Sequence, residues 1–110
     1  MEENNFYQQV YELARMIPQG RITSYGAIAK ALGRPGAARI VGYAMGQAGK
    51  ADPPVPAHRV LNHKGELTAK EAFGKGNRMQ ELLEKEGLTI KNNKIVNFNR
   101  FFWNPLEELD

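Results

Sequence analysis

The chain has 110 residues, 42% of them hydrophobic and 25% charged, which is typical of one compact globular domain. It contains no cysteine, which excludes disulfides, a thiolate nucleophile and any zinc site that needs a cysteine ligand. No apolar run is long enough to cross a bilayer, and the N-terminus lacks the pattern of a leader peptide. We therefore expect an intracellular, cytoplasmic protein with no membrane partner.

The net charge of +3 is unevenly distributed along the chain. The stretch between Glu12 and Asp52 contains no acid, but holds the cations Arg15, Arg21, Lys30, Arg34, Arg39 and Lys50. Such a basic block suits a polyanion, and release of counterions would make the binding depend on salt. A solvated surface with uneven charge is the alternative explanation.

Three helices are predicted in the first half of the chain. The first covers 5–17, where apolar residues recur at helical spacing (Phe6, Val10, Leu13 and Ile17). The second begins after Ser24, a favourable N-cap, and ends by Gly33. The third covers 36–47 and turns an apolar face inward (Ala37, Val41 and Ala44). Two short helices joined by a tight turn predict a helix-turn-helix over about 24–47.

Short strands and one more helix are expected in the second half. Segments 59–61 and 66–68 are predicted to pair as a hairpin. A helix should begin at Asn77, where Asn77 and Gln80 have capping-box spacing, and end at Gly87. Segments 88–90 and 95–96 predict a closing hairpin around the turn Asn92-Asn93. The expected fold class is α/β, a single small domain over 1–110 with a winged helix-turn-helix core and short β-hairpins.

The predicted third helix has an unusual outer side. Ala38, Arg39, Gly42 and Gly46 fall together there, opposite the apolar face. A helix that reads base edges in the major groove normally projects several polar side chains, whereas this one offers small residues and one long cation. A smooth stripe lets a nucleic-acid backbone approach closely, which suits the minor groove. Close packing against another helix uses the same small residues and is the alternative.

Three motifs stand in order along the chain, at 17–26 (IPQGRITSYG), 37–45 (AARIVGYAM) and 55–60 (VPAHRV). Over most of 5–90 the sequence resembles the C-terminal, DNA-binding domain of the O6-alkylguanine-DNA alkyltransferases. It is similar above all to the alkyltransferase-like proteins, in which the active-site motif Pro-Cys-His-Arg-Val has lost its cysteine. Ala57 stands at that place in the motif. The aromatic tail 99–103 also resembles the ending of short bacterial members.

The resemblance implies a machinery that flips a base out of double-stranded DNA. It gives Tyr25 the task of pressing on the 3′ phosphate of the target nucleotide and helping to rotate it outward. It makes Arg39 a finger that fills the gap in the base stack, which a planar guanidinium can do. Further DNA contacts are implied at Ser24, Ala37, Ala38 and Gly42.

The resemblance also implies a pocket for the flipped base. Its walls match Met45 and the segment Val55, Pro56 and Ala57. The loop 66–70 matches the part that closes over the base, and Lys70 falls where some alkyltransferase-like proteins place a cation against the guanine. A solvated lysine is the alternative for Lys70. The small side chain of Ala57 leaves space beside the O6 substituent for bulkier alkyl groups.

In active family members a cysteine thiolate attacks the alkyl carbon, a histidine and a glutamate relay its proton, and an asparagine orients the loop. Ala57 offers only a methyl group at that place. His58 and Glu86 match the relay, and no residue clearly matches the asparagine. We therefore expect no alkyl transfer, no catalytic residue and no cofactor. We expect His58 to be retained as a buried, hydrogen-bonded residue, with Arg59 as its polar neighbour.

The resemblance thus implies a monomeric, nucleoid-associated damage sensor, which binds O6-alkylguanine and flags it for nucleotide excision repair proteins. A helix-turn-helix transcription regulator bound to undamaged DNA is the second hypothesis, and the shortage of base-reading side chains argues against it. An enzyme that uses another nucleophile (Ser24, Tyr25 or Thr68) is a third, although none of these is adjacent to His58 in sequence. Zinc at His58 and His63 is weaker still, because other ligands at suitable spacing are lacking.

Overall fold

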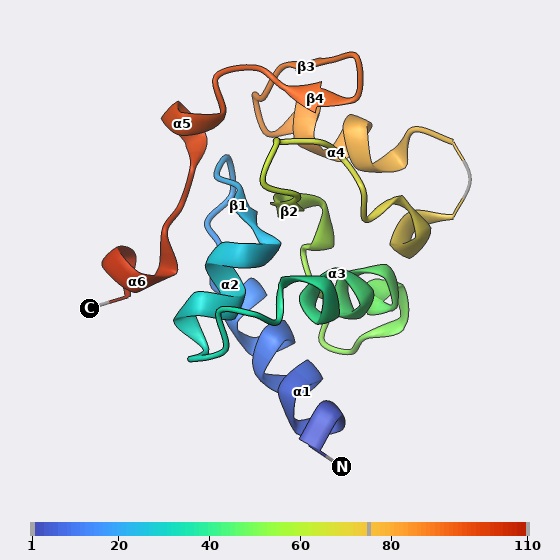
Figure 1. The fold of residues 1–110 in the computed structure, drawn as a ribbon. Helices are drawn as coiled ribbons and strands as arrows, with labels where there is room; N and C mark the ends of the chain where they lie inside the picture. Colours follow the sequence, from blue (N-terminus) through green and yellow to red (C-terminus); the bar gives the residue numbers. More distant parts are fainter. Residues whose placement is uncertain (1, 75, 110) are drawn as a thin grey trace.

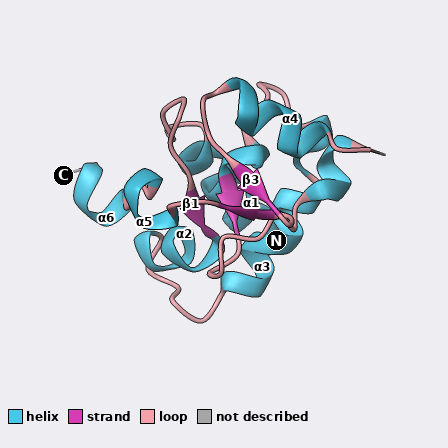
Figure 2. Ribbon diagram, turned by 90° about the horizontal axis from the view of Figure 1, so that it is seen from above, coloured by secondary structure: helices cyan, strands magenta, loops and turns pink. Residues whose placement is uncertain are grey.

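The computed structural model describes residues 2–74 and 76–109, except for the side chains of 2–4, 70 and 71. One pair of short strands lies near the centre of the molecule among the helices, and a second pair forms a hairpin at the top of Figure 1; Figure 2 shows the molecule from above. The helices are α1 (Glu2–Ala14), α2 (Tyr25–Ala31), α3 (Ala38–Gly46), α4 (Arg78–Lys85), α5 (Phe98–Phe101) and α6 (Pro105–Glu108). Single 3-10 turns form at η1 (Ala48–Lys50), η2 (Ala57–Arg59) and η3 (Lys70–Phe73). The strands are β1 (Thr23–Ser24), β2 (Val60–Leu61), β3 (Ile90–Lys91) and β4 (Lys94–Ile95).

The three predicted N-terminal helices are present and pack on one another, although α1 ends at Ala14 and not at the predicted residue 17. Helix α1 lies against α2 and α3, and α2 and α3 form the helix-turn-helix. The Ser24 hydroxyl accepts a hydrogen bond from the Ala27 amide at 3.1 Å and so caps α2. The inward face of α3 is buried as expected (Ala37, Val41 and Ala44). The prediction of an α/β fold with a helix-turn-helix core is therefore confirmed.

The first of the two predicted hairpins is wrong. Strand β2 pairs in parallel with β1, with Thr23 opposite Val60, and does not pair with 66–68. Val60 and Leu61 are fully buried, so the core holds this strand between β1 and the helices. After the turn, Glu66 instead bridges to Lys94 of β4. The second hairpin is confirmed: β3 and β4 are antiparallel, and Asn92 and Asn93 both have positive φ.

Helix α4 begins and ends close to the predicted residues, but its capping box is absent. In the described part of the chain, the Asn77 side chain makes no capping hydrogen bond. Gln80 donates instead to Glu84 one turn further along, at 3.2 Å. Gly87 stops the helix with a φ of 94°, a backbone conformation that suits glycine.

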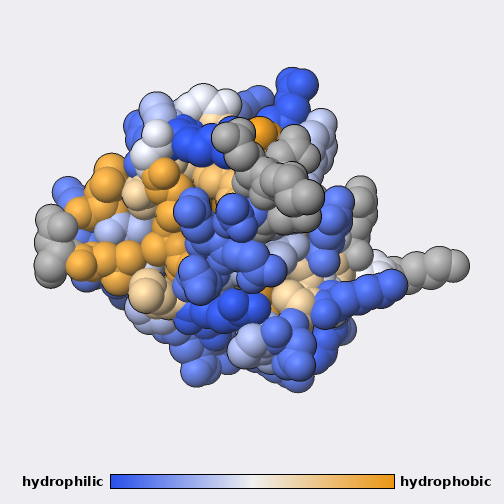
Figure 3. All heavy atoms as spheres, turned by 90° about the horizontal axis from the view of Figure 1, so that it is seen from below, coloured by the Kyte–Doolittle hydropathy of each residue, from blue (hydrophilic) through white to orange (hydrophobic). Residues whose placement is uncertain are grey.

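The C-terminal tail contributes α5 and α6, which the sequence does not predict. Trp103 is buried, and the backbone of Ile22 forms a parallel bridge with Phe102. Arg21 donates to the Phe102 carbonyl at 2.7 Å, so the tail is fixed beside the strand that leads to Tyr25. Helix α6 rests on α2, and apolar surface gathers on this side of the molecule, at the left of Figure 3. No described helix is both long and apolar enough to cross a membrane.

Candidate nucleic-acid interface

The outer side of α3 forms the floor of a hollow of about 410 Å³. Residues from α2, α3 and the loop before η3 line it, among them Tyr25, Ala38, Arg39, Gly42, Tyr43 and Thr68. The structure thus brings together the two residues to which the resemblance gives the flipping roles, Tyr25 and Arg39. The small residues predicted to form a smooth stripe lie in the hollow and are not covered by another helix.

Three features position Tyr25: its place in α2, the close approach of α3 to its ring, and a hydrogen bond to its hydroxyl. It is the first residue of α2, directly after the N-cap Ser24. A Cβ built on Gly42 would stand 3.5 Å from the Tyr25 ring, so the helix backbone passes close to the ring. The Tyr25 hydroxyl and the Thr68 hydroxyl are 2.7 Å apart and share a hydrogen bond. Burial raises the pKa of Tyr25 above 10.0 and the Thr68 bond lowers it less, so the phenol keeps its proton at neutral pH.

Arg39 lies in the first turn of α3 and is exposed. Within the described part of the chain its guanidinium makes no hydrogen bond or ion pair, in contrast to other members of the basic block. Arg15 donates to the Pro53 carbonyl at 2.7 Å, and Arg34 lies 4.3 Å from the centre of the Phe6 ring. The basic block is therefore only partly a free surface. The two residues before Arg39, which are also predicted to contact DNA, differ in exposure. Ala38 is half-buried, whereas Ala37 is buried in the core.

The predicted walls of a base pocket do not line one open cavity. Met45 and Ala57 are buried, with 0% and 1% of their surface exposed. Val55 and Pro56 line a separate hollow of about 420 Å³. The side chain of Lys70, predicted to lie against the guanine, is outside the described residues. The lesion pocket remains a prediction.

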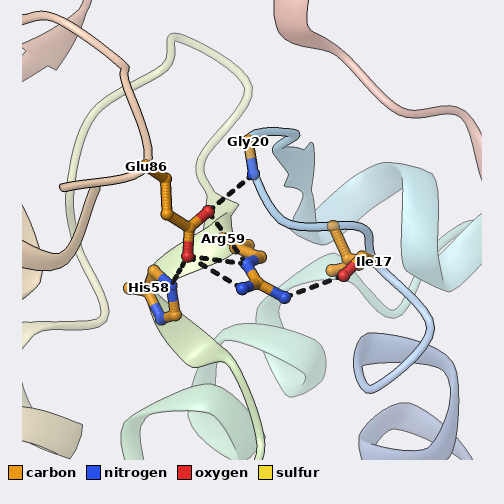
Figure 4. Close-up of polar contacts among 5 residues, drawn as sticks. All are labelled: Ile17, Gly20, His58, Arg59 and Glu86. Carbon is orange, nitrogen blue, oxygen red and sulfur yellow. Dashed lines mark hydrogen bonds and ion pairs between the residues drawn. The ribbon is translucent and has the colours of Figure 1, made fainter. Parts of the chain in front are cut away.

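A second polar group starts at His58, the residue after Ala57 in the chain, and joins distant parts of the chain (Figure 4). The His58 ring, at Nε2, is 2.7 Å from Oε2 of Glu86, as the resemblance implies. Arg59 donates to the same carboxylate at 2.8–3.1 Å and to the Ile17 carbonyl at 2.9 Å. The Gly20 amide donates to Oε1 of Glu86 at 2.8 Å. One carboxylate thus ties η2 and the end of α4 to the turn that precedes β1.

Burial and hydrogen bonding fix the charges of this group. Burial alone would raise the pKa of Glu86, but hydrogen bonds from Arg59, the Gly20 amide and His58 outweigh it and lower the pKa to about 2. Burial lowers the pKa of His58 below 6.5, against the smaller opposing effect of Glu86. At neutral pH His58 is therefore neutral and donates its Nε2 proton to an ionised Glu86. The methyl group of Ala57 has no proton to give this histidine, so a structural role for the group stays the prediction.

Comparisons with known proteins support the same family. The family model described as "6-O-methylguanine DNA methyltransferase, DNA binding domain" matches residues 5–88. "Alkyltransferase-like protein 1" of Schizosaccharomyces pombe is 33% identical over 109 residues, which are 96% of this chain and 100% of that protein. A Vibrio parahaemolyticus protein named "DNA base-flipping protein" is 32% identical over 103 residues, 93% of this chain and 99% of the other.

The chain belongs to the alkyltransferase-like proteins. A solved structure agrees with this assignment: S. pombe Atl1 in complex with damaged DNA containing O6-carboxymethylguanine superposes with a TM-score of 0.73 at 34% identity. The superposition covers 93% of this chain and 97% of that one. The likeness extends through nearly the whole chain, and so beyond residues 5–88, which the family model matches.

Two further residues of this alkyltransferase-like protein line the hollow, and its motifs do not single them out. Tyr43 is 58% exposed in the hollow, four residues after Arg39 on the same side of α3. Its helical spacing from Arg39 was the signal that could have found it. The sequence suggests Thr68 only as an alternative nucleophile, and no local signal predicts its bond to a tyrosine 43 residues away. Among the described residues, no three His, Asp or Glu side chains come together as a metal site.

Proposed function

We propose that the protein recognises O6-alkylguanine in double-stranded DNA and holds the extruded base without repairing it. The observation that carries the proposal is the hollow in which Tyr25 and Arg39 stand over small residues of α3. A DNA backbone can approach this floor closely because Gly42 has no side chain there. Tyr25 offers a phenolic proton to a phosphate, and Arg39 has a free planar cation to fill the gap in the base stack.

Ala57 decides what happens after binding. The chain has no cysteine, so it has no thiol to accept an alkyl group. The hydroxyls of Tyr25 and Thr68 bond to each other and are poor nucleophiles toward an unactivated alkyl carbon. Recognition without transfer is therefore the proposed outcome. A relative named for base flipping, and one solved with damaged DNA, support the recognition step.

A protein that holds a lesion without repairing it must act through other proteins. We infer that it flags the lesion for nucleotide excision repair and that it acts as a monomer on nucleoid DNA. These steps rest on the family resemblance and on the lack of chemistry at Ala57. Co-precipitation of repair proteins with lesion-bound protein, but not with protein on undamaged DNA, is the expected result. Recovery independent of the lesion would contradict the inference.

The deciding experiment measures binding to matched duplexes that carry guanine or O6-methylguanine at one position. Wild type should prefer the lesion. Arg39→Ala should weaken lesion binding about tenfold or more, because one stacking contact contributes ~1–3 kcal/mol and 1.4 kcal/mol is tenfold. Tyr25→Ala should lose much of the same preference. Lys91→Ala, which removes an equal charge from the β3–β4 hairpin, is the control and should leave the preference intact.

Other results would decide against this function. Equal affinity for both duplexes in wild type would overturn the proposal. Tight binding to one undamaged sequence would favour the transcription regulator instead. An alkyl mass added to the protein after incubation with alkylated DNA would show transfer after all. Affinity should also fall as salt rises, because phosphate contacts release counterions.

A further inference from the structure

The hydrogen bond between Tyr25 and Thr68 joins the helix-turn-helix to the loop between β2 and η3. The two oxygens are 2.7 Å apart, and the residues are 43 positions apart in the sequence. Thr68 is exposed, and it lines the same hollow as Arg39. A threonine here is not needed for packing, so its hydroxyl requires another explanation.

The loop presents this hydroxyl from a fixed position. The residues on either side, Leu67 and Ala69, are buried, with 1% and 2% of their surface exposed. The Leu67 amide donates to the Asn93 carbonyl at 3.1 Å, and the Asn93 side chain donates back to the Leu67 carbonyl at 3.3 Å. Thr68 is therefore an exposed side chain on an anchored backbone. Such a group can orient a partner with little loss of entropy on binding.

Tyr25 has one proton to give, and the direction of that proton matters. A phenol and a threonine hydroxyl each carry one donor hydrogen, and a DNA phosphate oxygen only accepts. If Tyr25 donated to Thr68, it would have no proton for a phosphate. If Thr68 donates to the Tyr25 oxygen, the phenolic proton stays free and points away from Thr68. Hydrogen bonds in such a chain also strengthen one another, most of all when the last acceptor is charged.

We propose that Thr68 is a positioning residue for Tyr25, whose hydroxyl donates to the phenolic oxygen and directs the phenolic proton to a DNA phosphate. This inference rests on the function proposed above, because it requires Tyr25 to meet the phosphate backbone. The ring of Tyr25 already packs near Gly42, so the rotation of its O–H bond is the freedom that remains to be set. Thr68 sets it before the DNA arrives.

The test compares Thr68→Val, which keeps the branched shape but loses the hydroxyl, with Thr68→Ser, which keeps the hydroxyl. Thr68→Val should weaken binding to the O6-methylguanine duplex about threefold to tenfold, the range expected for one hydrogen bond. Thr68→Ser should remain within about twofold of wild type. Both variants should melt within a few degrees of wild type, because the side chain is exposed. Equal losses in the two variants would overturn the proposal.

A double-mutant cycle separates positioning from direct contact with DNA. In a Tyr25→Phe background there is no phenolic oxygen to hold, so Thr68→Val should cause no further loss. An undiminished further loss would show that Thr68 acts on the DNA by itself, and the proposal would be wrong. In the free protein, Thr68→Val should raise the pKa of Tyr25 further, since the Thr68 bond lowers it. An unchanged pKa would mean that the bond does not form in solution.

The same measurements distinguish the two proposals. If wild type prefers the lesion and Tyr25→Phe weakens that preference, but Thr68→Val does not, only the positioning role fails. If wild type shows no preference for the lesion, the proposed function fails, and the positioning role fails with it.

Discussion

Two arginines show how differently this molecule treats its two polar regions. Arg59 reaches into the interior, where its guanidinium binds the Glu86 carboxylate and the Ile17 carbonyl. Arg39 stands on the surface, and among the described residues nothing binds its guanidinium. The first region satisfies its own donors and acceptors, whereas the second leaves them available. We therefore expect the interior group to stabilise the fold, and we expect the hollow to be where a ligand binds.

The largest expected effect tests whether the interior group contributes to the free energy of unfolding. Glu86→Ala should lower the free energy of unfolding by about 3–5 kcal/mol, because it leaves the Arg59 cation partly buried without its partner. Urea unfolding followed by tryptophan fluorescence measures this. The control is Glu84→Ala in α4, two residues before Glu86, where the exposed carboxylate accepts a bond from Gln80, and it should change stability little.

DNA binding by the folded fraction of Glu86→Ala completes this test. It should stay within about twofold of wild type, since the hollow does not include the interior group. A loss of stability below about 1 kcal/mol, or a large loss of lesion preference, would contradict the division between the two regions.

Low pH should reduce the stability of the protein through two titrating residues of the interior group, His58 and Glu86. Burial holds the pKa of His58 below 6.5, and hydrogen bonds hold that of Glu86 at about 2 against an ordinary 4.5. As pH falls through each ordinary value, the unfolded chain takes up a proton that the native protein resists, so stability falls in both steps. The free energy of unfolding should therefore decline below pH 6.5 and again between 4.5 and about 2.

The variant His58→Gln isolates the first of these steps. Its stability should lose the decline just below pH 6.5 and keep the one at lower pH. Unfolding in urea at a series of pH values, for wild type and variant, checks both. Identical pH profiles for the two proteins would show that His58 does not titrate as its burial implies.

The smallest expected effect tests whether DNA approaches the floor of the hollow closely at Gly42. In Gly42→Ala the new methyl group would meet the Tyr25 ring at an ordinary contact distance of 3.5 Å, so the free protein should tolerate it. Better helix propensity should raise stability by up to about 1 kcal/mol. DNA binding should nevertheless weaken, because the methyl group would occupy the floor of the hollow, where we propose that the DNA backbone approaches α3. Gly26→Ala, outside the lining of the hollow, is the matched control, and equal binding by both variants would count against close approach.

Local signals in the sequence predict most of the helices and one of the hairpins. Ser24 caps α2 because a short hydroxyl side chain satisfies a free amide, and this rule needs no distant partner. Asn92 and Asn93 make their turn for a similar reason, since asparagine tolerates positive φ. The predicted pairing of 59–61 with 66–68 failed because β2 pairs with β1, far earlier in the chain. Parallel pairing of distant strands leaves no local pattern in the residues.

The candidate site shows the same limit. Its main residues, Tyr25 and Arg39, were found through their motifs, and the pairing of His58 with Glu86 followed from the resemblance. The contribution of the Gly20 amide could not be predicted, because a backbone donor is the same in every residue. The bond from Thr68 to Tyr25 depends on where the loop that carries Thr68 is anchored. The types of residue in the loop do not predict that position.

The tail that docks beside β1 has a consequence for how copies of the protein meet. The Ile22 amide donates to the Phe101 carbonyl at 3.0 Å, and the Ile22 carbonyl accepts from the Trp103 amide at 2.7 Å. Without the tail, these groups would form an open strand edge, and such an edge can pair with a strand of another molecule and start aggregation. Residues 101–103 therefore cover the backbone edge at Ile22, and we expect this cover to keep it from pairing with a strand of a second copy.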